Sequence, residues 1–442
     1  MINFNMTRPV LKILNDKKEF NAFLQSLKII KTKLKNVKII PYVIASGYPF
    51  LNSGYASRTH HILNTFNSMY SDKQYIAVFN IGFPYHHIRV DLKNKLMNND
   101  LFLNKLDNVF YLTLPNLPKN KSNYNQLFDI LSRYFNFTTI HVASDWNNAM
   151  PIIHYCNNKS LKSIYEIRGM WHISAACKKI YFNRPINKDI DIIRPSLGER
   201  ECINKCSVPL FITPQLKNYA KNESKNKIFP SLNCSFKNAP IFCNCFNTNN
   251  KIIKKEKTDN NFIIGYIGSI VYYEGLIETI DHLEKLIGKT SKNIEFHIIG
   301  DYENFAHPQK LSDCKKKTFV KFLGEVSKNE VVDKLKTFDL YVIPRLDMAV
   351  TNMVSPIKPY EPMALKIPLL MSDCDCLKDI SQDGKNCMLF KKGNFDDFNK
   401  KLKHIIDNGY DESILQNGYN FVKKERNWNY MIKKIGLYDL LL

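Results

Sequence analysis

Three charged residues near the end of the chain stand at a spacing that suits a bound diphosphate. Arg345 follows an apolar run at 340–343, and Lys358 and Glu361 open a short helical stretch before a second apolar run at 367–371. The N–H groups and the dipole of a helix start favour negative charge, and the two cations add to that attraction. Glu361, about one turn into the helix, can accept hydrogen bonds from paired hydroxyls such as those of a ribose. The segment therefore predicts a nucleotide-diphosphate site.

The elements that position these residues form a strand, a loop, a short helix and a second strand. This unit builds the crevice of an open parallel sheet, where ligands bind beyond the carboxyl ends of the strands. Apolar runs alternate with helical patterns along the whole chain, which predicts a doubly wound α/β architecture in two halves. The strands that we expect are 37–45, 75–79, 109–114, 139–143, 162–167, 208–213, 263–267, 294–299, 319–323, 340–343, 367–371 and 388–390.

Two domains are the ordinary expectation for 442 residues. A stretch rich in asparagine and lysine divides the two α/β halves and predicts an interdomain linker. The predicted parts are a basic helical extension at 1–36, a first α/β domain at 37–240, the linker at 241–260, a second α/β domain at 261–415 and a helical tail at 416–442.

The net charge of +22 fits three kinds of partner: nucleic acid, an anionic membrane surface or an anionic substrate. No known nucleic-acid reader motif is present. Residues 1–36 show apolar positions near helical spacing with lysines between them. This helix either lies on anionic lipid or packs on its own domain with a solvated basic face.

Neither a membrane span of about 18–20 apolar residues nor a signal-peptide core is evident in the sequence. We therefore expect a cytoplasmic protein that works at the inner face of the cell membrane or free of it. The eleven cysteines include no C-x-x-C pair. This pattern favours reduced thiols and argues against a structural zinc site.

Several polar residues of the first half stand where a cleft is expected. Gly54 lies in a loop before a helix and permits close approach of the backbone to a ligand. Glu166 and Arg168 follow a strand end, where they would face the cleft or form an ordinary ion pair. His141 ends another strand as a candidate for the active site, although a hydrogen-bonded structural histidine is the commoner case.

Four segments carry a resemblance to a known family. They are SGYASRTH at 53–60, YEIRGMW at 165–171, GYIGS with YEGL at 265–276, and SPIKPYEPMALKIPLLMSD at 355–373. Together they resemble the retaining GT-B glycosyltransferases of family 4, in a branch with a YEGL loop. GFP at 82–84 and IFPSLN at 228–233 are also similar to that branch. The resemblance implies two Rossmann-like domains around a cleft and a tail that crosses back to the first domain.

The resemblance also implies which residues form the site. Arg345, Lys358 and His141 are the expected catalytic residues. The donor side is expected to comprise Gly54, Gly268, Ser269, Glu274, Gly300, Gly324, Val326, Met353, Val354, Ser355 and Glu361. The acceptor side is expected to comprise Ser53, Tyr55, Arg58, Glu166, Arg168, Trp171 and His172.

The chain departs from the family pattern at several positions. Many relatives place an arginine and a lysine on the donor phosphates where this chain has Ser269 and Glu274, so Arg345 and Lys358 must supply the charge. The first acid of the paired-glutamate motif is Met353 here, and contacts to the donor sugar would come from backbone amides of 353–355. A glutamate after the tryptophan is His172, and the second histidine of a His-x-His pair is Ala143.

The resemblance implies a retaining transferase that uses a sugar nucleotide; we expect it to be metal-independent and to favour a UDP-sugar over a GDP-sugar. The acceptor would be a saccharide or a lipid-linked saccharide in the synthesis of capsule, lipopolysaccharide or another surface polysaccharide. An inverting transferase or an epimerase with the same architecture is one alternative. The other is a basic protein without catalytic activity that binds nucleic acid or lipid.

Overall fold

The first α/β domain is built on a seven-stranded sheet. In the computed structural model, the chain is described over residues 17–51, 53–81, 102–115, 117, 120–223, 232, 234–247, 261–301, 308–378 and 380–442. The strand order is β3-β4-β2-β1-β5-β6-β7, and all neighbouring strands are parallel except β3 and β4. The strands are β1 Lys38–Ile44, β2 Lys73–Phe79, β3 Leu103–Leu106, β4 Val109–Thr113, β5 Thr139–Ala143, β6 Lys162–Ile167 and β7 Val208–Phe211.

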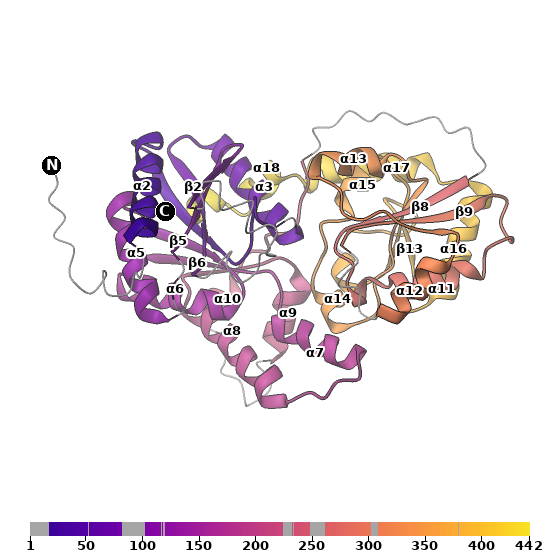
Figure 1. The fold of residues 1–442 in the computed structure, drawn as a ribbon, viewed down its shortest axis with the longest axis horizontal. Coiled ribbons are helices and arrows are strands. Elements are labelled where there is room, and N and C mark those ends of the chain that lie inside the picture. Colours follow the sequence, from indigo (N-terminus) through magenta and orange to yellow (C-terminus); the bar gives the residue numbers. More distant parts are fainter. Residues whose placement is uncertain are drawn as a thin grey trace.

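The second domain repeats this plan with six parallel strands in the order β10-β9-β8-β11-β12-β13. The two sheets lie side by side in one molecule, as Figure 1 shows. Its strands are β8 Asn261–Ile267, β9 Asn293–Ile299, β10 Val320–Phe322, β11 Leu340–Ile343, β12 Leu369–Ser372 and β13 Met388–Phe390. Two Rossmann-like sheets with interleaved helices confirm the predicted fold class.

Helices cover both sheets. Those of the first domain are α2 Lys17–Lys33, α3 Gly54–Met69, α5 Lys121–Phe135, α6 Trp146–Asn158, α7 Trp171–Tyr181, the π-helix η1 Asp189–Ile193, α8 Arg194–Lys205, α9 Pro214–Glu223 and α10 Cys234–Lys237. Those that follow are η2 Tyr272–Glu274, α11 Leu276–Glu284, α12 Pro308–Lys316, α13 Lys328–Leu335, α14 Ala349–Met353, α15 Tyr360–Ala364, η3 Asp375–Leu377, α16 Phe395–Asn408, α17 Glu412–Glu425, α18 Trp428–Lys434 and α19 Leu437–Leu440. None of the helices in the described ranges is long and apolar enough to cross a membrane.

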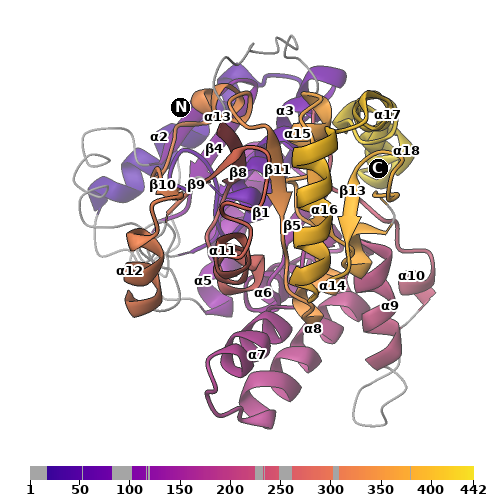
Figure 2. The same cartoon turned by 90° about the vertical axis from the view of Figure 1, so that its right-hand side faces the viewer.

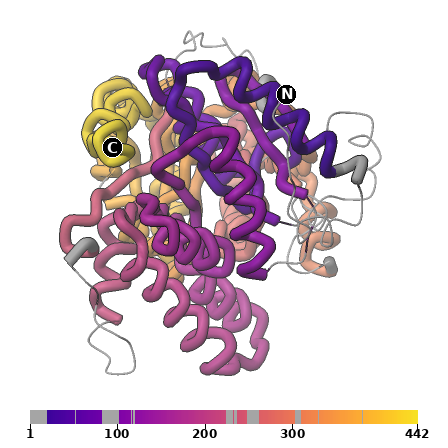
Figure 3. Tube along the Cα trace, turned by 90° about the vertical axis from the view of Figure 1, so that its left-hand side faces the viewer, coloured from indigo at the N-terminus to yellow at the C-terminus, as the bar shows by residue number. Residues whose placement is uncertain are grey.

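Helix α2 shows which alternative holds for the basic amphipathic stretch. Phe20, Phe23, Leu27 and Ile30 are buried in the core of the first domain, and the helix lies on the outer surface of that domain (Figure 3). Because the core takes up this apolar face, the face is not free to enter lipid. The described part of the stretch therefore packs on its own domain with a solvated basic side.

The C-terminal helices return to the first domain. Trp428, Met431 and Ile432 of α18 are buried in a core cluster with residues of β1 and α3, and α18 lies beside α3 in Figure 1. Part of the predicted linker packs there too, because Phe242 is buried in the same cluster and its N–H donates to Phe211 O at 2.7 Å. Three stretches that are far apart in the sequence, namely α3, the segment around Phe242 and α18, thus pack together on this side of the first domain.

Candidate functional site

Arg345 and Lys358 converge on one carboxylate at the carboxyl end of the second sheet. Arg345 Nη2 and Lys358 Nζ each lie 2.9 Å from Glu274 Oε1. Lys358 also donates to the hydroxyl of Tyr266 at 2.7 Å. The structure therefore brings together two predicted cations from the loop after β11 and the start of α15, with Glu274 of η2 as the counterion of both.

Two glycines make this convergence possible. A Cβ on Gly268, whose φ is +140°, would lie 2.4 Å from Lys358 Cε. A Cβ on Gly275, at φ +70°, would lie 2.1 Å from the Pro344 carbonyl oxygen. A Cβ on Gly268 would displace the end of the Lys358 side chain, and a Cβ on Gly275 would clash with backbone; positive φ itself favours glycine at both positions. The glycines of the GYIGS and YEGL segments thus let the loops after β8 and β11 meet.

Charge and burial act against each other in this cluster. Burial would raise the pKa of the Glu274 carboxyl, but Arg345 and Lys358 outweigh that effect and hold it at about 2. For Lys358, burial and the nearby charge of Arg345 together lower the pKa more than Glu274 raises it. The charged form of Lys358 therefore destabilises the folded state. Groups with a pKa shifted in this way are common at functional sites.

Two atoms of the cluster have no hydrogen-bond partner among the described residues: Arg345 Nε and Glu274 Oε2. Buried polar atoms are nearly always paired in native proteins, with water or ligand where protein is absent. A donor N–H on Arg345 beside the Lys358 ammonium suits the oxygens of a bound anion. The arrangement can therefore hold a phosphate group.

The loop at 353–355 is fixed through its carbonyl groups. Thr213 Oγ1 donates to Met353 O at 2.6 Å, Arg345 Nη1 to Val354 O at 2.8 Å, and Asn244 Nδ2 to Ser355 O at 2.7 Å. Thr213 belongs to the first domain and Asn244 to the segment that leaves it. The loop is thus positioned from the first domain as well as from its own.

The expectation that backbone amides of this loop bind the donor sugar needs a correction. The N–H of Val354 donates to Val350 O at 3.0 Å, as the last turn of α14, and is not free for a ligand. Met353 is buried against the core of the first domain. Val354 instead approaches that domain, since its Cγ2 would lie 3.5 Å from a Cβ on Gly169.

The other predicted donor-side glycines meet at the ends of three neighbouring strands. Gly268 N–H donates to Ile299 O at 2.9 Å, and Gly300 N–H donates to Gly324 O at 2.8 Å. Ser269 follows directly, and its carbonyl accepts from the Tyr266 hydroxyl at 2.8 Å. Val326, beside the same loop, is partly buried. These residues form one edge of the second sheet, next to the cation pair.

Glu361 lies one turn after Lys358 and is partly exposed. It also faces the first domain: burial, and to a lesser extent the Glu361 carboxylate, raise the pKa of Tyr48. Gly54, at the start of α3, is exposed, and Ser53 caps this helix by accepting from Ala56 N at 3.3 Å. Glu361 of the second domain is therefore a neighbour of Tyr48, in the loop that precedes α3.

Glu166 and Arg168 form part of a satisfied buried network. Glu166 Oε1 accepts from Arg58 Nε at 2.7 Å and from Arg168 Nε at 2.8 Å, and the Tyr42 hydroxyl donates to Oε2. The two guanidinium groups outweigh the effect of burial and hold the pKa of Glu166 well below its usual range. The structure therefore shows the ion-pair alternative for Glu166 and Arg168. Both side chains are buried and bind other protein groups.

Arg58 needs a similar correction. Its guanidinium donates to Phe242 O at 2.7 Å, to Cys243 O at 3.0 Å and to Asn244 Oδ1 at 2.8 Å. With its Nε bound to Glu166 as well, the side chain is committed to the segment that links the two domains. It is almost fully buried, so it binds protein and not an acceptor.

His141 is 0% exposed and lies under the same network. Its Nδ1 is 3.1 Å from the Tyr75 hydroxyl, and its Nε2 is 3.4 Å from Glu166 Oε2. His141 is thus enclosed by protein, as in the hydrogen-bonded structural alternative, and its catalytic role stays a prediction. The sequence placed it correctly at a strand end but could not show that its side chain points into the core.

Two aromatic residues remain available on the acceptor side. Trp171 is 43% exposed, and its ring stacks on Tyr55 with centroids 5.6 Å apart. Stacked aromatic faces are suited to an apolar ligand surface. The next residue, His172, is buried instead, with Nε2 3.8 Å from Glu223 Oε1. The helix start thus offers Trp171 to a ligand and turns His172 inward.

Sequence reasoning missed three residues of the site: Tyr266, Thr213 and Asn244. Tyr266 is hidden in an apolar strand, and Thr213 follows β7 without any motif. Asn244 stands in the predicted linker, where the apolar neighbours Phe242 and Cys245 were the available signal of a packed segment.

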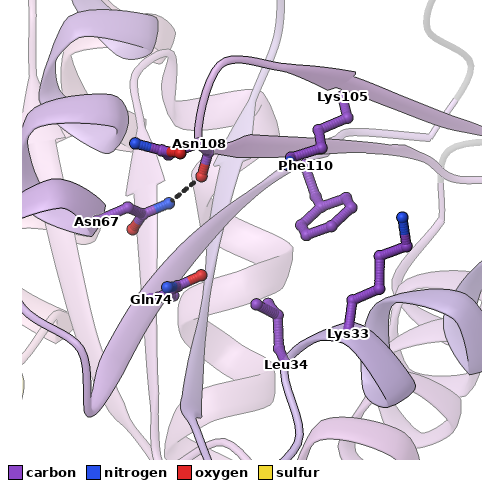
Figure 4. A pocket seen from close by; sticks show the side chains of 7 residues that line it. All are labelled: Lys33, Leu34, Asn67, Gln74, Lys105, Asn108 and Phe110. Atoms are coloured by element: carbon purple, nitrogen blue, oxygen red, sulfur yellow. Dashed lines mark hydrogen bonds between the residues drawn. The ribbon is translucent and has the colours of Figure 1, made fainter.

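A separate hollow of about 530 Å³ lies away from these residues. Its lining comes from the end of α2, from α3, and from β2, β3 and β4, as the close view in Figure 4 shows. The lining residues are Lys33, Leu34, Asn67, Gln74, Lys105, Asn108 and Phe110. None of the predicted site residues contributes to it. In the described ranges, no group of three His, Cys, Asp or Glu side chains could hold a metal ion.

The sequence of the second domain matches a known family. Residues 247–421 match the model for glycosyl transferases group 1. Over 184 residues, the chain is 24% identical to a capsular polysaccharide biosynthesis glycosyltransferase, CapM, of Staphylococcus aureus, covering 40% of this chain and 46% of that protein. The chain spans about half the length of the curated relatives that it matches.

Solved structures share the fold over nearly the whole chain. Sucrose-phosphate synthase of Thermosynechococcus elongatus superimposes with a TM-score of 0.68 at 10% identity, covering 91% of this chain and 99% of that one. HepE of Anabaena, in complex with UDP and glucose, gives 0.62 at 12% identity, covering 92% and 100%. The chain therefore has the GT-B fold that the resemblance implied, and residues 247–421 match the model for glycosyl transferases group 1.

Proposed function

We propose that the chain transfers a sugar from a nucleoside-diphosphate donor to a saccharide or lipid-linked acceptor, with retention of the anomeric configuration. The observation that carries this proposal is the convergence of Arg345 and Lys358 on Glu274 at the end of the second sheet. A departing diphosphate needs positive charge within a few ångströms, and fixed cations in a water-poor site stabilise it strongly.

In the proposed reaction, the bond between the anomeric carbon and the diphosphate oxygen breaks, and both electrons leave with the diphosphate. The acceptor hydroxyl oxygen forms the new bond on the same face of the sugar. Its proton passes to an oxygen of the leaving phosphate. Arg345 and Lys358 neutralise the developing charge in the role that a metal ion has in other transferases. Glu274 holds both cations in place before the donor binds.

Glu361 would accept hydrogen bonds from the ribose hydroxyls, and the edge formed by Gly268, Gly300 and Gly324 would receive the rest of the nucleotide. The complex of HepE with UDP supports a UDP-sugar as the first donor to test. Tyr55 and Trp171 would pack against the acceptor. The name of CapM supports a role in the synthesis of a surface polysaccharide such as capsule or lipopolysaccharide.

A thermal-shift screen against a panel of sugar nucleotides, followed by NMR of the product, tests this proposal. We expect stabilisation by one nucleotide class and a product with the anomeric configuration of the donor. A product with the opposite configuration would show an inverting transferase, and conversion of the donor sugar without transfer would show an epimerase. Salt-sensitive RNA binding without turnover would favour the non-catalytic alternative.

A further inference from the structure

The part of the molecule that projects farthest from both sheets is the turn between α7 and α8. We call residues 178–197 the tip segment; it lies at the lower edge of Figures 1 and 2. Ile180 and Ile190 are each 60% exposed. Among the described residues, only the C-terminal Leu442 is a more exposed large apolar side chain.

These apolar side chains stand in a basic surrounding. The tip segment contains five basic residues and two acidic ones. Lys179 pairs with Asp191 and so joins the end of α7 to η1, which brings the neighbours Ile180 and Ile190 to the same end of the domain. The other basic residues, Lys178, Arg184, Lys188 and Arg194, are exposed. Exposed apolar side chains ringed by lysine and arginine are typical of surfaces that enter the headgroup region of an anionic bilayer.

The base of the tip segment touches the second domain near the candidate site. The rings of Tyr181 and Tyr272 lie 5.1 Å apart, and the Tyr181 hydroxyl donates to Glu278 Oε1 at 3.3 Å. Trp171, at the other end of the same 11-residue helix, is about 16 Å away along its axis. A bilayer in contact with the tip would therefore lie about one short helix from the exposed Trp171–Tyr55 pair.

From these observations we propose that the tip segment is a docking surface for an anionic lipid bilayer. Ile180, Ile190 and Leu197 enter the boundary between headgroups and acyl chains, and the basic residues around them contact lipid phosphates. The surface differs from the one that the sequence suggested, because the apolar face of α2 is buried in the core. The proposal does not depend on the transfer reaction, since binding is measured without a sugar nucleotide.

The test is co-sedimentation of the full chain with vesicles that contain phosphatidylglycerol, compared with vesicles of phosphatidylcholine alone. We expect binding to the anionic vesicles only, and weaker binding as salt is added. Ile180→Glu/Ile190→Glu should lower the partition coefficient by about tenfold or more. The matched control is Ile287→Glu/Leu323→Glu, which changes two exposed apolar residues of the second domain and should leave binding unchanged. Circular dichroism melts check that each variant is folded.

A second pair of variants separates the tip from α2. Lys28→Glu/Lys35→Glu reverses two exposed lysines of the predicted basic extension and should change binding less than Arg184→Glu/Lys188→Glu does. The proposal is overturned if the wild type ignores anionic vesicles, or if the tip variants bind as well as the wild type. It is also overturned if the tip variants alter only the oligomeric state, measured by light scattering, because the surface would then join two copies of the chain.

Discussion

Replacing Lys358 by alanine should abolish most of the sugar transfer and leave the protein folded. Burial and the nearby charge of Arg345 together lower the pKa of this lysine more than Glu274 raises it, so its charge does not stabilise the free protein. The carboxylate of Glu274 keeps Arg345 at 2.9 Å in the variant. What the fold loses is the hydrogen bond of 2.7 Å to Tyr266, which is worth about 1 kcal/mol, and one of the two cations that keep the buried Glu274 carboxylate charged.

The effect on catalysis should be much larger. Removal of one group that stabilises developing negative charge commonly costs about 3–4 kcal/mol of barrier, which corresponds to a rate loss of about 10²–10³. The assay is release of nucleoside diphosphate in the presence of donor and acceptor, with urea unfolding measured in parallel. A decrease in kcat without unfolding is the expected result.

Lys392 provides the matched control. It is similarly buried in the same domain and lies 3.4 Å from Asp347 and 3.3 Å from Asp375. These carboxylates outweigh the effect of burial and raise its pKa, so its charge does stabilise the fold. Lys392→Ala should therefore lose stability and keep its transfer rate. If Lys358→Ala is folded and transfers sugar within about threefold of the wild-type rate, the account of the cation pair is refuted.

Three further predictions test other parts of the site. Glu274→Gln should destabilise the fold at neutral pH by about 3 kcal/mol, the equivalent of a pKa lowered from 4.5 to about 2. This contribution is complete above about pH 4.5 and is lost as the pH falls toward 2. The difference in the free energy of urea unfolding between wild type and variant should therefore shrink over that pH range, and a constant difference would be contrary evidence. Asn244→Ala removes the bond to Ser355 O and the acceptor of Arg58 Nη1, and it should raise the KM for the donor by about tenfold. Asn247→Ala, whose partners are Thr65 and Trp428, should not change the KM; equal KM values for the two variants would reject this role of Asn244. Glu361→Gln should weaken nucleotide binding in calorimetry, and an unchanged affinity would disprove the contact with the ribose.

The strands of both sheets were predictable because most are buried on both faces and appear as short continuous apolar runs. The predicted ranges 139–143, 162–167, 340–343 and 388–390 coincide with β5, β6, β11 and β13. Strand β3 was missed. It is antiparallel to β4 and contains exposed positions, so its four residues carry no apolar run.

The cation pair was also predictable, because Arg345 and Lys358 flank one loop and a short helix. The role of Glu274 was not. From the sequence, position 274 was expected to lack the cation that many relatives have there. The structure shows instead that Glu274 is the counterion of both Arg345 and Lys358. That contact joins residues 71 positions apart in the chain, and only the folded loops after β8 and β11 bring them together.

Residues at the ends of strands were the least predictable. His141 and Glu166 both stand where a cleft is expected, yet both are fully buried. Side chains alternate between the two faces of a strand, and a sequence does not show which face points toward an open surface. Trp171 and His172 begin helix α7, where successive side chains point in different directions around the axis, and one is exposed while the next is buried. The segments GFP at 82–84 and most of IFPSLN at 228–233 lie outside the described residues.

The most direct measurement is a crystal structure of the chain with a bound nucleoside diphosphate. The account predicts phosphate oxygens within hydrogen-bond distance of both the Arg345 guanidinium, including its Nε, and the Lys358 ammonium, with the ribose hydroxyls on Glu361. A nucleotide bound elsewhere, or phosphates held without either cation, would contradict it.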